Sequence, residues 1–367
     1  MNDRYNINIE VVTPLAIGAG TECDWTRGVD YVVKDNKVFV LDLQKAISKG
    51  VDVDRFSALL ASSDEKGICE LLDKHLETSS RYIFDIPVTS ANPIKAFLRN
   101  QLHDKPVIAG SSLKGAIRSV IFSYLRREER DNQSVFGSSK DGTDFMRFIQ
   151  IGDIEMEATK LVNTRLINLW KDKSGYMWHG GWKHGNHFTS KEYLPMGFNT
   201  LYECVLPGMS GRGNIKFSKE GFMTVVNNPK LTEKVKYASE KNAILDGGPE
   251  KLFGIVNDAT RNYLLKEKEF FEKYQEAEYI ESILNSIEDL LDRVPKDSSY
   301  CILKMSAGSG FHSITGDWQF DDYLQTGFHN KFVEGEQLKI PRYKSRKIAE
   351  YDSRLLPMGF VKLSLIK

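Results

Sequence analysis

The sequence predicts an α+β protein, because strand-like alternation occurs at both ends of the chain and amphipathic helical segments lie between them. Ile7, Ile9 and Val11 alternate with polar residues, which is typical of a half-buried strand. Apolar residues recur at helical spacing over 113–125 and again over 280–294. The chain has 367 residues, enough for two domains of about 150 residues each.

The composition is that of an ordinary globular protein, with 41% hydrophobic and 27% charged residues. No apolar run approaches the roughly 18 residues that a membrane span requires, and the N-terminus has no signal-peptide core. The four cysteines are far apart, which predicts reduced thiols rather than disulfides or a zinc site. We therefore expect a cytoplasmic protein without membrane contact.

The charges balance overall, with 50 basic and 50 acidic residues, but they are distributed unevenly. Residues 99–130 contain seven basic and three acidic side chains, and residues 338–354 contain six and two. Residues 229–295 contain ten basic and fourteen acidic side chains. This pattern favours one face that binds an anion and another that contacts a partner, with scattered solvated charge as the alternative.

The N-terminal part of the chain is predicted to contain a strand, a hairpin and a group of short helices. The first strand runs into TPLAIGAG, where Pro14 ends pairing and Gly18 and Gly20 permit a tight turn. VDYVVKD and KVFVLD predict a hairpin whose turn is Asp35-Asn36. Residues 43–78 predict two or three short helices.

The helix over 113–125 has an N-terminal segment suited to an anion. Ser111 and Ser112 are good N-cap residues, and Gly110 before them lets the backbone turn. Lys114 and Arg118 are four residues apart and lie off the apolar stripe. Free N–H groups, the helix dipole and two aligned cations together predict an anion site, with phosphate as the ligand.

Residues 170–192 are rich in glycine, tryptophan and histidine and predict a loop. The loop could be a stacking platform for unpaired bases, or its aromatic side chains could fold back on the core. The spacing of its histidines matches no zinc pattern, which disfavours a metal site. The tryptophans and histidines concerned are Trp170, Trp178, Trp182, His179, His184 and His187.

The C-terminal half is predicted as a helical segment followed by strands. Residues 229–294 form the main helical insertion, and its helix over 280–294 is ended by Pro295. Strand-like sequence returns in YCILKMSAGSGFHSIT, and LLPMGFVKLSLIK forms the final strand. The acidic outer face of the helix over 280–294 fits a protein contact better than an RNA contact.

Five motifs, in this order, resemble those of the RAMP superfamily of CRISPR proteins. They are TPLAIGAG, IAGSSLKGAIRSVI, VFGSS…IQIGDIE, SAGSGFHSIT and LLPMGFVKLSL. Their order and the helical insertion are similar to those of the terminal backbone subunit of the type III-A (Csm) effector complex. The resemblance covers most of the chain, and its most specific piece is GSSLKG.

The resemblance implies two ferredoxin-like (RNA-recognition-like) domains with glycine-rich loops and helical insertions. The first would span residues 1–195, with the insertion 43–78 and the loop 170–192. The second would span residues 196–367, with the insertion 229–294, which we expect to prevent addition of a further subunit.

The implied function is that of a non-catalytic RNA-binding subunit of a Csm interference complex. It would cap the backbone filament at the 3′ end of the guide RNA (crRNA) and support crRNA maturation and antiviral defence. Its partners would be the sugar-phosphate backbone of the crRNA 3′ portion and the neighbouring RAMP backbone subunit. The small helical subunit and host trimming nucleases are further candidate partners, and no cofactor or metal is implied.

The resemblance also implies which residues contact RNA. They lie in the first glycine loop, in the GSSLKG helix start, in the NTRLIN segment and in the second glycine loop. These residues are Gly18, Gly20, Gly110, Ser111, Ser112, Lys114, Gly115, Arg118, Arg165, Gly308, Ser309, Gly310 and His312.

Other functions remain open at this point. A metal-independent CRISPR endoribonuclease would need a general acid and base, for which His312, or His179 with Tyr176, are the nominal residues. A capping subunit of another type III subtype and a protein scaffold using the acidic helix are further alternatives. Repeated backbone subunits of such complexes carry an aspartate for target cleavage; Asp24 and Asp30 lie near that place, and we expect Asp30 to be a strand residue instead.

Overall fold

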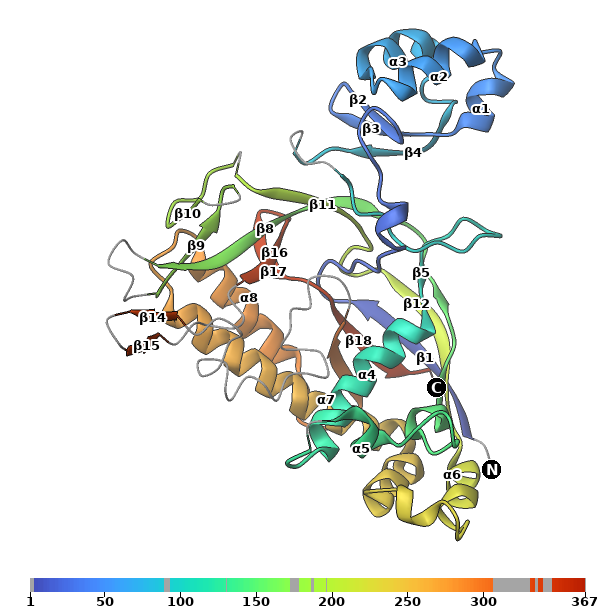
Figure 1. The fold of residues 1–367 in the computed structure, drawn as a ribbon, viewed down its shortest axis with the longest axis vertical. Helices are drawn as coiled ribbons and strands as arrows, with labels where there is room; N and C mark the ends of the chain where they lie inside the picture. The colour runs from blue at the N-terminus through green and yellow to red at the C-terminus, as the bar shows by residue number, and fades with distance from the viewer. Residues whose placement is uncertain are drawn as a thin grey trace.

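A computed structural model describes most of the chain. The described residues are 3–88, 93–129, 131–171, 178–185, 188–195, 197–305, 331–333, 336–338 and 345–366. It contains antiparallel sheets covered by helices, as expected for an α+β protein (Figure 1).

The first sheet joins the two ends of the chain. Its strand order is β13-β18-β1-β12-β6, and every neighbouring pair is antiparallel. Ile7 of β1 lies opposite Leu365 of β18 and Gly213 of β12, which confirms both terminal strands predicted from alternation. The strands are β1 (Asp3–Val11), β6 (Ile149–Ile151), β12 (Ser210–Phe217), β13 (Tyr300–Lys304) and β18 (Phe360–Leu365).

The second sheet is built around the long strand β8. Its order is β10-β9-β8-β16-β17, and β11 also pairs with β8. Both sheets contain strands from before and after residue 195, so the expected domain boundary there does not coincide with the division between the sheets. The strands are β8 (Lys160–Lys171), β9 (Trp178–Lys183), β10 (Thr189–Ser190), β11 (Asn199–Cys204), β16 (Ser345–Tyr351) and β17 (Arg354–Pro357).

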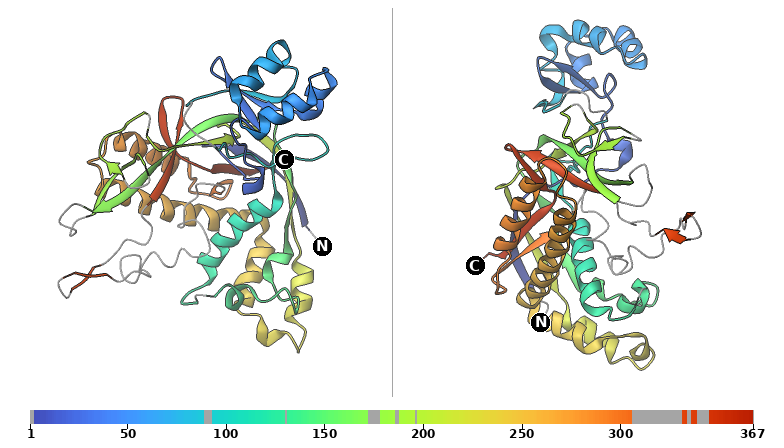
Figure 2. Two further views of the ribbon diagram at one scale, coloured as in Figure 1. Left: turned by 45° about the horizontal axis from the view of Figure 1, so that its top comes forward. Right: turned by 90° about the vertical axis from the view of Figure 1, so that its left-hand side faces the viewer.

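Three helices cover these sheets: α4 (Gly110–Leu125), α7 (Ala238–Lys273) and α8 (Ile280–Arg293). α7 contacts α4, α8 and β13, and α8 contacts β17 (Figure 2). α7 is kinked where Gly248 has a φ of 52° and Pro249 follows, because proline cannot continue the hydrogen-bond ladder. The helix predicted over 280–294 is confirmed, with Ile283, Ile287 and Leu290 buried.

A small lobe, residues 26–88, projects from the rest of the molecule, which we call the body (Figure 1). Its hairpin turn is Asp35-Asn36, whose φ angles of 50° and 60° confirm the predicted tight turn. The segment predicted to hold two or three short helices contains three, and Asp42, Asp52 and Asp64 cap them. The elements are β2 (Tyr31–Lys34), β3 (Lys37–Leu41), β4 (Ser80–Asp85), α1 (Leu43–Ser48), α2 (Val53–Ala61) and α3 (Glu65–Leu72).

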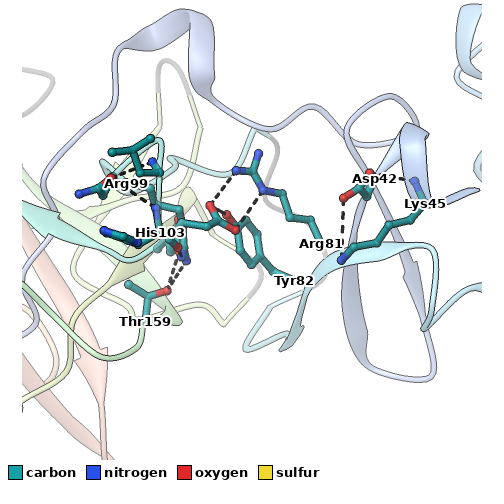
Figure 3. A network of polar contacts seen from close by, with 11 residues as sticks. Asp42, Lys45, Arg81, Tyr82, Arg99, His103 and Thr159 are labelled. Atoms are coloured by element: carbon teal, nitrogen blue, oxygen red, sulfur yellow. Dashed lines mark hydrogen bonds and ion pairs between the residues drawn. The ribbon is translucent and has the colours of Figure 1, made fainter.

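Polar contacts join the lobe to the body (Figure 3). Arg81 of β4 donates to Asp104 at 2.7 Å, and the Tyr82 hydroxyl donates to the same carboxylate. The guanidinium of Arg99 lies 4.0 Å from the centre of the Tyr82 ring and pairs with the buried Glu203. This ion-pair network joins β4 to the body, and an apolar cluster of lobe residues with Leu161 and Leu201 joins the two as well.

The remaining elements are short. β5 (Val107–Ile108) pairs with β7 (Ile154–Glu155), and β14 (Lys331–Val333) pairs with β15 (Glu336–Leu338). α5 spans Asn132–Phe136 and α6 spans Lys219–Val226. Short 3-10 turns occupy Thr21–Cys23, Asp73–His75, Phe145–Phe148 and Thr232–Lys234. All four cysteines are unpaired, and none of the described helices is long and apolar enough to cross a bilayer.

Candidate nucleic-acid interface

The start of α4 is fixed by a carboxylate from outside the helix. The Gly110 N–H donates to Asp153 Oδ1 at 2.7 Å, and the N-cap position is Ala109, which supplies no side-chain cap. The interpretation of Ser111 and Ser112 as caps was therefore wrong; both lie in the first turn. A Cβ on Gly110 would lie 2.2 Å from the Ile151 carbonyl oxygen, so glycine is required there by packing.

A cleft of about 470 Å³ opens beside this helix start. Of the residues predicted to contact RNA, Ser111, Lys114, Gly115 and Arg118 all line it. The other wall follows α5, and its lining residues are Ser139, Asp144, Met146 and Arg147. The structure thus brings the two aligned cations of α4 together with a third, Arg147, around one depression.

The cleft has a net positive charge with one internal ion pair. Arg118 Nη1 lies 3.3 Å from Asp144 Oδ1, and its guanidinium covers the Phe136 ring at 4.1 Å. Burial lowers the pKa of Lys114, Asp144 raises it, and the nearby Arg118 lowers it further. Lys114 and Arg147 have no ion pair with any described residue, so they are the cations of this cleft that an anionic ligand would neutralise most directly.

Gly115 leaves this surface open. A Cβ at Gly115 would meet no heavy atom within 4 Å, so packing within the chain does not require glycine there. An absent side chain on a helix surface beside cations lets a ligand's backbone approach closely. Gly110 and Gly115 therefore have different roles, although the GSSLKG motif presents them together.

The first glycine loop lies on a separate part of the body. Gly18 is exposed and bridges to Phe97, and a Cβ there would meet nothing within 4 Å. Gly20 has a φ of 110°, which a side chain rarely adopts, just before the turn Thr21–Cys23. Neither glycine lines the α4 cleft, so their predicted RNA contact stays a prediction.

Arg165 has a structural role in this chain. It is 1% exposed and donates to the carbonyl oxygens of Pro195 and Leu194 and to Asn199 Oδ1. Burial lowers the pKa of its guanidinium. The prediction that it contacts RNA has no support from this placement, because its donors hold the segment before β11 instead.

The tryptophan-rich segment was predicted as a loop, and this is wrong for its described part. Residues 178–183 form β9, which pairs with β8. Trp182 is fully buried and its Nε1 donates to the Glu278 carbonyl oxygen at 2.9 Å, so it cannot stack on a base. Among the described residues, no group of three or more His, Cys, Asp or Glu is placed to hold a metal ion.

Several predicted residues lie outside the described part of the chain. Gly308, Ser309, Gly310 and His312 of the second glycine loop are among them, as are Tyr176 and His187. The residues that the sequence reasoning missed are Asp144, Arg147 and Ser139, which follow the VFGSS segment. The signal was available, because that segment belongs to the recognised motif, but its side chains had been given no role.

Comparisons with known proteins agree with the motif resemblance. The model of the RAMP superfamily matches residues 8–320. The CRISPR system Cms protein Csm5 of Methanocaldococcus jannaschii is 24% identical over 414 aligned residues, covering 98% of this chain and 89% of that protein.

Two solved structures share the fold. A chain in the cryo-EM structure of a Csm-crRNA-target RNA ternary complex of a type III-A CRISPR-Cas system has a TM-score of 0.64 at 19% identity, with both chains fully covered. The crystal structure of T. onnurineus Csm5 has a TM-score of 0.61 at 19% identity, covering 96% of this chain and 99% of that one. With its motifs in order and a family match over most of its length, the chain belongs to the RAMP superfamily.

Proposed function

We propose that the chain is a non-catalytic crRNA-binding subunit of a type III-A CRISPR (Csm) complex that ends the backbone filament at the 3′ end of the crRNA. Membership of the RAMP superfamily, a relative named Csm5 and a fold shared with a chain of a Csm-crRNA-target RNA complex support this. In this role the protein acts in the cytoplasm and supports crRNA maturation and antiviral defence.

The observation that carries the proposal is the α4 cleft. Lys114, Arg118 and Arg147 surround it, while Asp144 is the one carboxylate in its lining. Cations and a bare helix surface at Gly115 hold sugar-phosphate without reading bases, because phosphates carry no sequence information. A subunit that binds guides of any sequence needs this kind of contact.

The first sheet supports one ferredoxin-like unit. Its strands β6, β12, β1 and β18 are adjacent in that order, and α4 follows β1 in the chain before β6. This is the arrangement of a split βαβ unit in which the first strand is central. We infer that a second such unit is built around β8, sharing its helical cover with the first.

The aspartates considered for target cleavage are engaged in structural contacts. Asp24 forms an ion pair with Lys95, and Asp30 Oδ2 accepts from the Thr26 N–H at 2.8 Å. A carboxylate that holds a turn or a lysine is poorly placed to bind a catalytic metal as well. Their engagement supports a subunit that binds RNA without cutting it.

The capping role requires a surface that does not bind a further backbone subunit. The outward side of α7 and α8 carries exposed acidic residues, including Glu272, Glu281 and Glu288. Like-charge juxtaposition opposes association. We infer that this acidic side, opposite the buried side of the helices, prevents addition of another backbone subunit.

The test is ultraviolet crosslinking of the full-length protein to end-labelled crRNA, with and without Mg²⁺, on a denaturing gel. An uncut crosslinked band that weakens in a Lys114→Ala, Arg147→Ala variant is expected. Lys66→Ala, on an 88% exposed lysine of the lobe, is the control. Discrete shorter RNA products would overturn the non-catalytic role.

A second measurement tests the terminal position. Native mass spectrometry of complexes reconstituted with crRNA and the neighbouring backbone subunit should show one copy of this chain per filament. Several copies per filament would contradict capping while leaving RNA binding intact.

A further inference from the structure

A groove lies at the N-terminal end of α8, where the β16–β17 hairpin meets the segment before β11. One part of it has a volume of about 310 Å³, and an adjoining depression has a volume of about 550 Å³. Both parts share Tyr279, Ser282 and Arg354. The α4 cleft shares no lining residue with this groove.

Two tyrosines form its aromatic wall. Tyr279 is 60% exposed and sits edge-to-face against Tyr193, with ring centres 5.1 Å apart. Tyr193 is held in turn by the buried Trp182, at 4.8 Å, which fixes its orientation. The backbone of Tyr279 has a φ of 62°, a costly conformation for a bulky residue. The fold thus maintains an exposed aromatic ring at a strained position.

The guanidinium of Arg165 already covers the Tyr193 ring, 4.6 Å from its centre, so the exposed Tyr279 is the ring that remains for a ligand. The charged residues that line the groove are mostly negative. Glu281, Glu350 and Asp352 line the groove. Glu350 accepts a hydrogen bond from Asn163 and interacts electrostatically with Arg165, whereas Glu281 and Asp352 have no ion pair within the described residues. Arg354 is the one cation of the lining, and its guanidinium is paired with Asp289. The positive end of the α8 dipole also points here, but Glu281 in its first turn offsets that charge.

We propose that this groove is a docking site for a basic side chain, arginine or lysine, presented by a partner protein. The face of Tyr279 attracts cations through its quadrupole, and the carboxylates of Glu281 and Asp352 add a complementary field. The same carboxylates repel phosphate, so the groove does not fit RNA. The site is independent of the α4 cleft and of RNA binding, and it gives the acidic end of α8 a specific ligand chemistry.

The probe is the pentapeptide acetyl-Gly-Gly-Arg-Gly-Gly-amide, titrated into full-length protein labelled with 3-fluorotyrosine. Fluorine NMR resonances of Tyr193 and Tyr279, assigned through Tyr→Phe variants, should shift saturably. The matched peptide with citrulline in place of arginine keeps the shape and loses the charge. We expect it to bind at least about tenfold more weakly.

Variants locate the site. Tyr279→Ala should lower the affinity for the arginine peptide about fivefold. Tyr279→Phe should keep the native affinity, because the face of the ring attracts the cation. Asp352→Asn should weaken it by a smaller factor and make binding less dependent on salt. Tyr124→Ala, which removes a 46% exposed tyrosine on α4, is the control and should change nothing.

Three results would overturn the proposal. Equal binding of the citrulline peptide would remove the role of charge. Unchanged binding in Tyr279→Ala would place the peptide elsewhere. A shift of the same resonances by an oligouridine probe, without one by the arginine peptide, would assign the groove to RNA bases. Because the probe contains no RNA, these outcomes are separate from those that test crRNA binding.

Discussion

The two segments that the sequence marks as helical insertions differ in what their apolar faces cover. Helices α1–α3 cover only the lobe's own sheet, in a cluster that includes Phe39, Phe56 and Leu72 and contains no residue beyond position 76. Helix α7 supplies residues to both large clusters of the body, and α8 supplies residues to the second. Phe253 belongs to the first of these clusters and Phe271 to the second.

By this difference, the lobe is an insertion with its own core, whereas α7 and α8 are a layer of the body's core. The lobe begins and ends where Trp25 and Ile94 exchange two backbone hydrogen bonds, of 2.8 and 2.9 Å, so the chain leaves and re-enters the body at one point. The segment 229–294 has no such closure, because its helices bury the faces of sheets built from distant strands. A sheet face without its helices would expose its core to water.

Deleting either helical segment is expected to have the largest effect on folding. Removing residues 229–294 should abolish folding, since the second body cluster loses both of its helices and the first loses every residue that α7 supplies. Replacing residues 26–93 by Gly-Gly should leave a folded body with a lower Tm, because Leu161 and Leu201 lose their contacts with the lobe. Thermal melts followed by circular dichroism, with size-exclusion chromatography, check both. A cooperative melt in the first deletion would contradict the comparison.

A matched pair of core substitutions tests whether the lobe and the body unfold separately. Phe253→Ala and Phe56→Ala each remove a ring that is 2% exposed, and each should cost about 3–5 kcal/mol where it acts. Phe253→Ala should lower the free energy of unfolding of the whole body. Phe56→Ala should raise hydrogen exchange within the lobe alone. Faster exchange in α4 of the Phe56→Ala variant would show that the lobe and body unfold together.

The pH dependence of stability should also distinguish body from lobe. Burial lowers the pKa of Lys304 from its usual 10.5 to about 8, while Glu267 raises it and Arg346 lowers it further. Between these pKa values the unfolded chain holds a proton that the folded chain has released, so the free energy of unfolding rises with pH. The rise should be roughly 1–3 kcal/mol.

Lys304→Met should flatten this rise in urea unfolding measured from pH 7.5 to 10. Lys66→Met, on the exposed surface of α3, should leave the rise unchanged. Burial also lowers the pKa of Lys241 in α7 to about 8, so part of the slope should remain in Lys304→Met. An identical slope in Lys304→Met and the native chain would mean that Lys304 keeps its proton through this range.

The smallest effect concerns RNA affinity. Lys114→Ala should lower the slope of log K against log salt by about 0.7, the loss of one phosphate contact on single-stranded RNA. Excision of residues 26–93 should leave that slope unchanged, because the cleft is formed by body residues. Fluorescence anisotropy of labelled crRNA over a salt series measures both. Lys114→Arg should restore the slope, and failure to do so would point to packing rather than charge.

The sequence predicted the local elements well. Alternation found β1 and β18, helical spacing found α4 and α8, and the Asp35-Asn36 turn was recognised from its residue types. These features depend on neighbours within a few positions, so they are visible in the chain itself. The choice of Lys114 and Arg118 as a cation pair rested on the same short-range geometry.

The sequence alone could not place side chains whose partners are distant. Arg165 was expected to contact RNA, yet residues 194–199 take up its donors. Trp182 seemed to belong to a loop, yet a carbonyl 96 residues away accepts its N–H. Asp153 caps α4 from 43 residues away. Each of these contacts exists only once the sheets have assembled.

The sequence by itself determined the family, the element types and the cationic start of α4, because motifs and periodicity are properties of short stretches. The tertiary structure alone decided that one helical segment is a separable lobe and the other a layer of the core. It also decided that Arg147 and Asp144 complete the cleft. Both features depend on burial and long-range hydrogen bonds. These form only after the sheets have assembled and left particular faces to be covered.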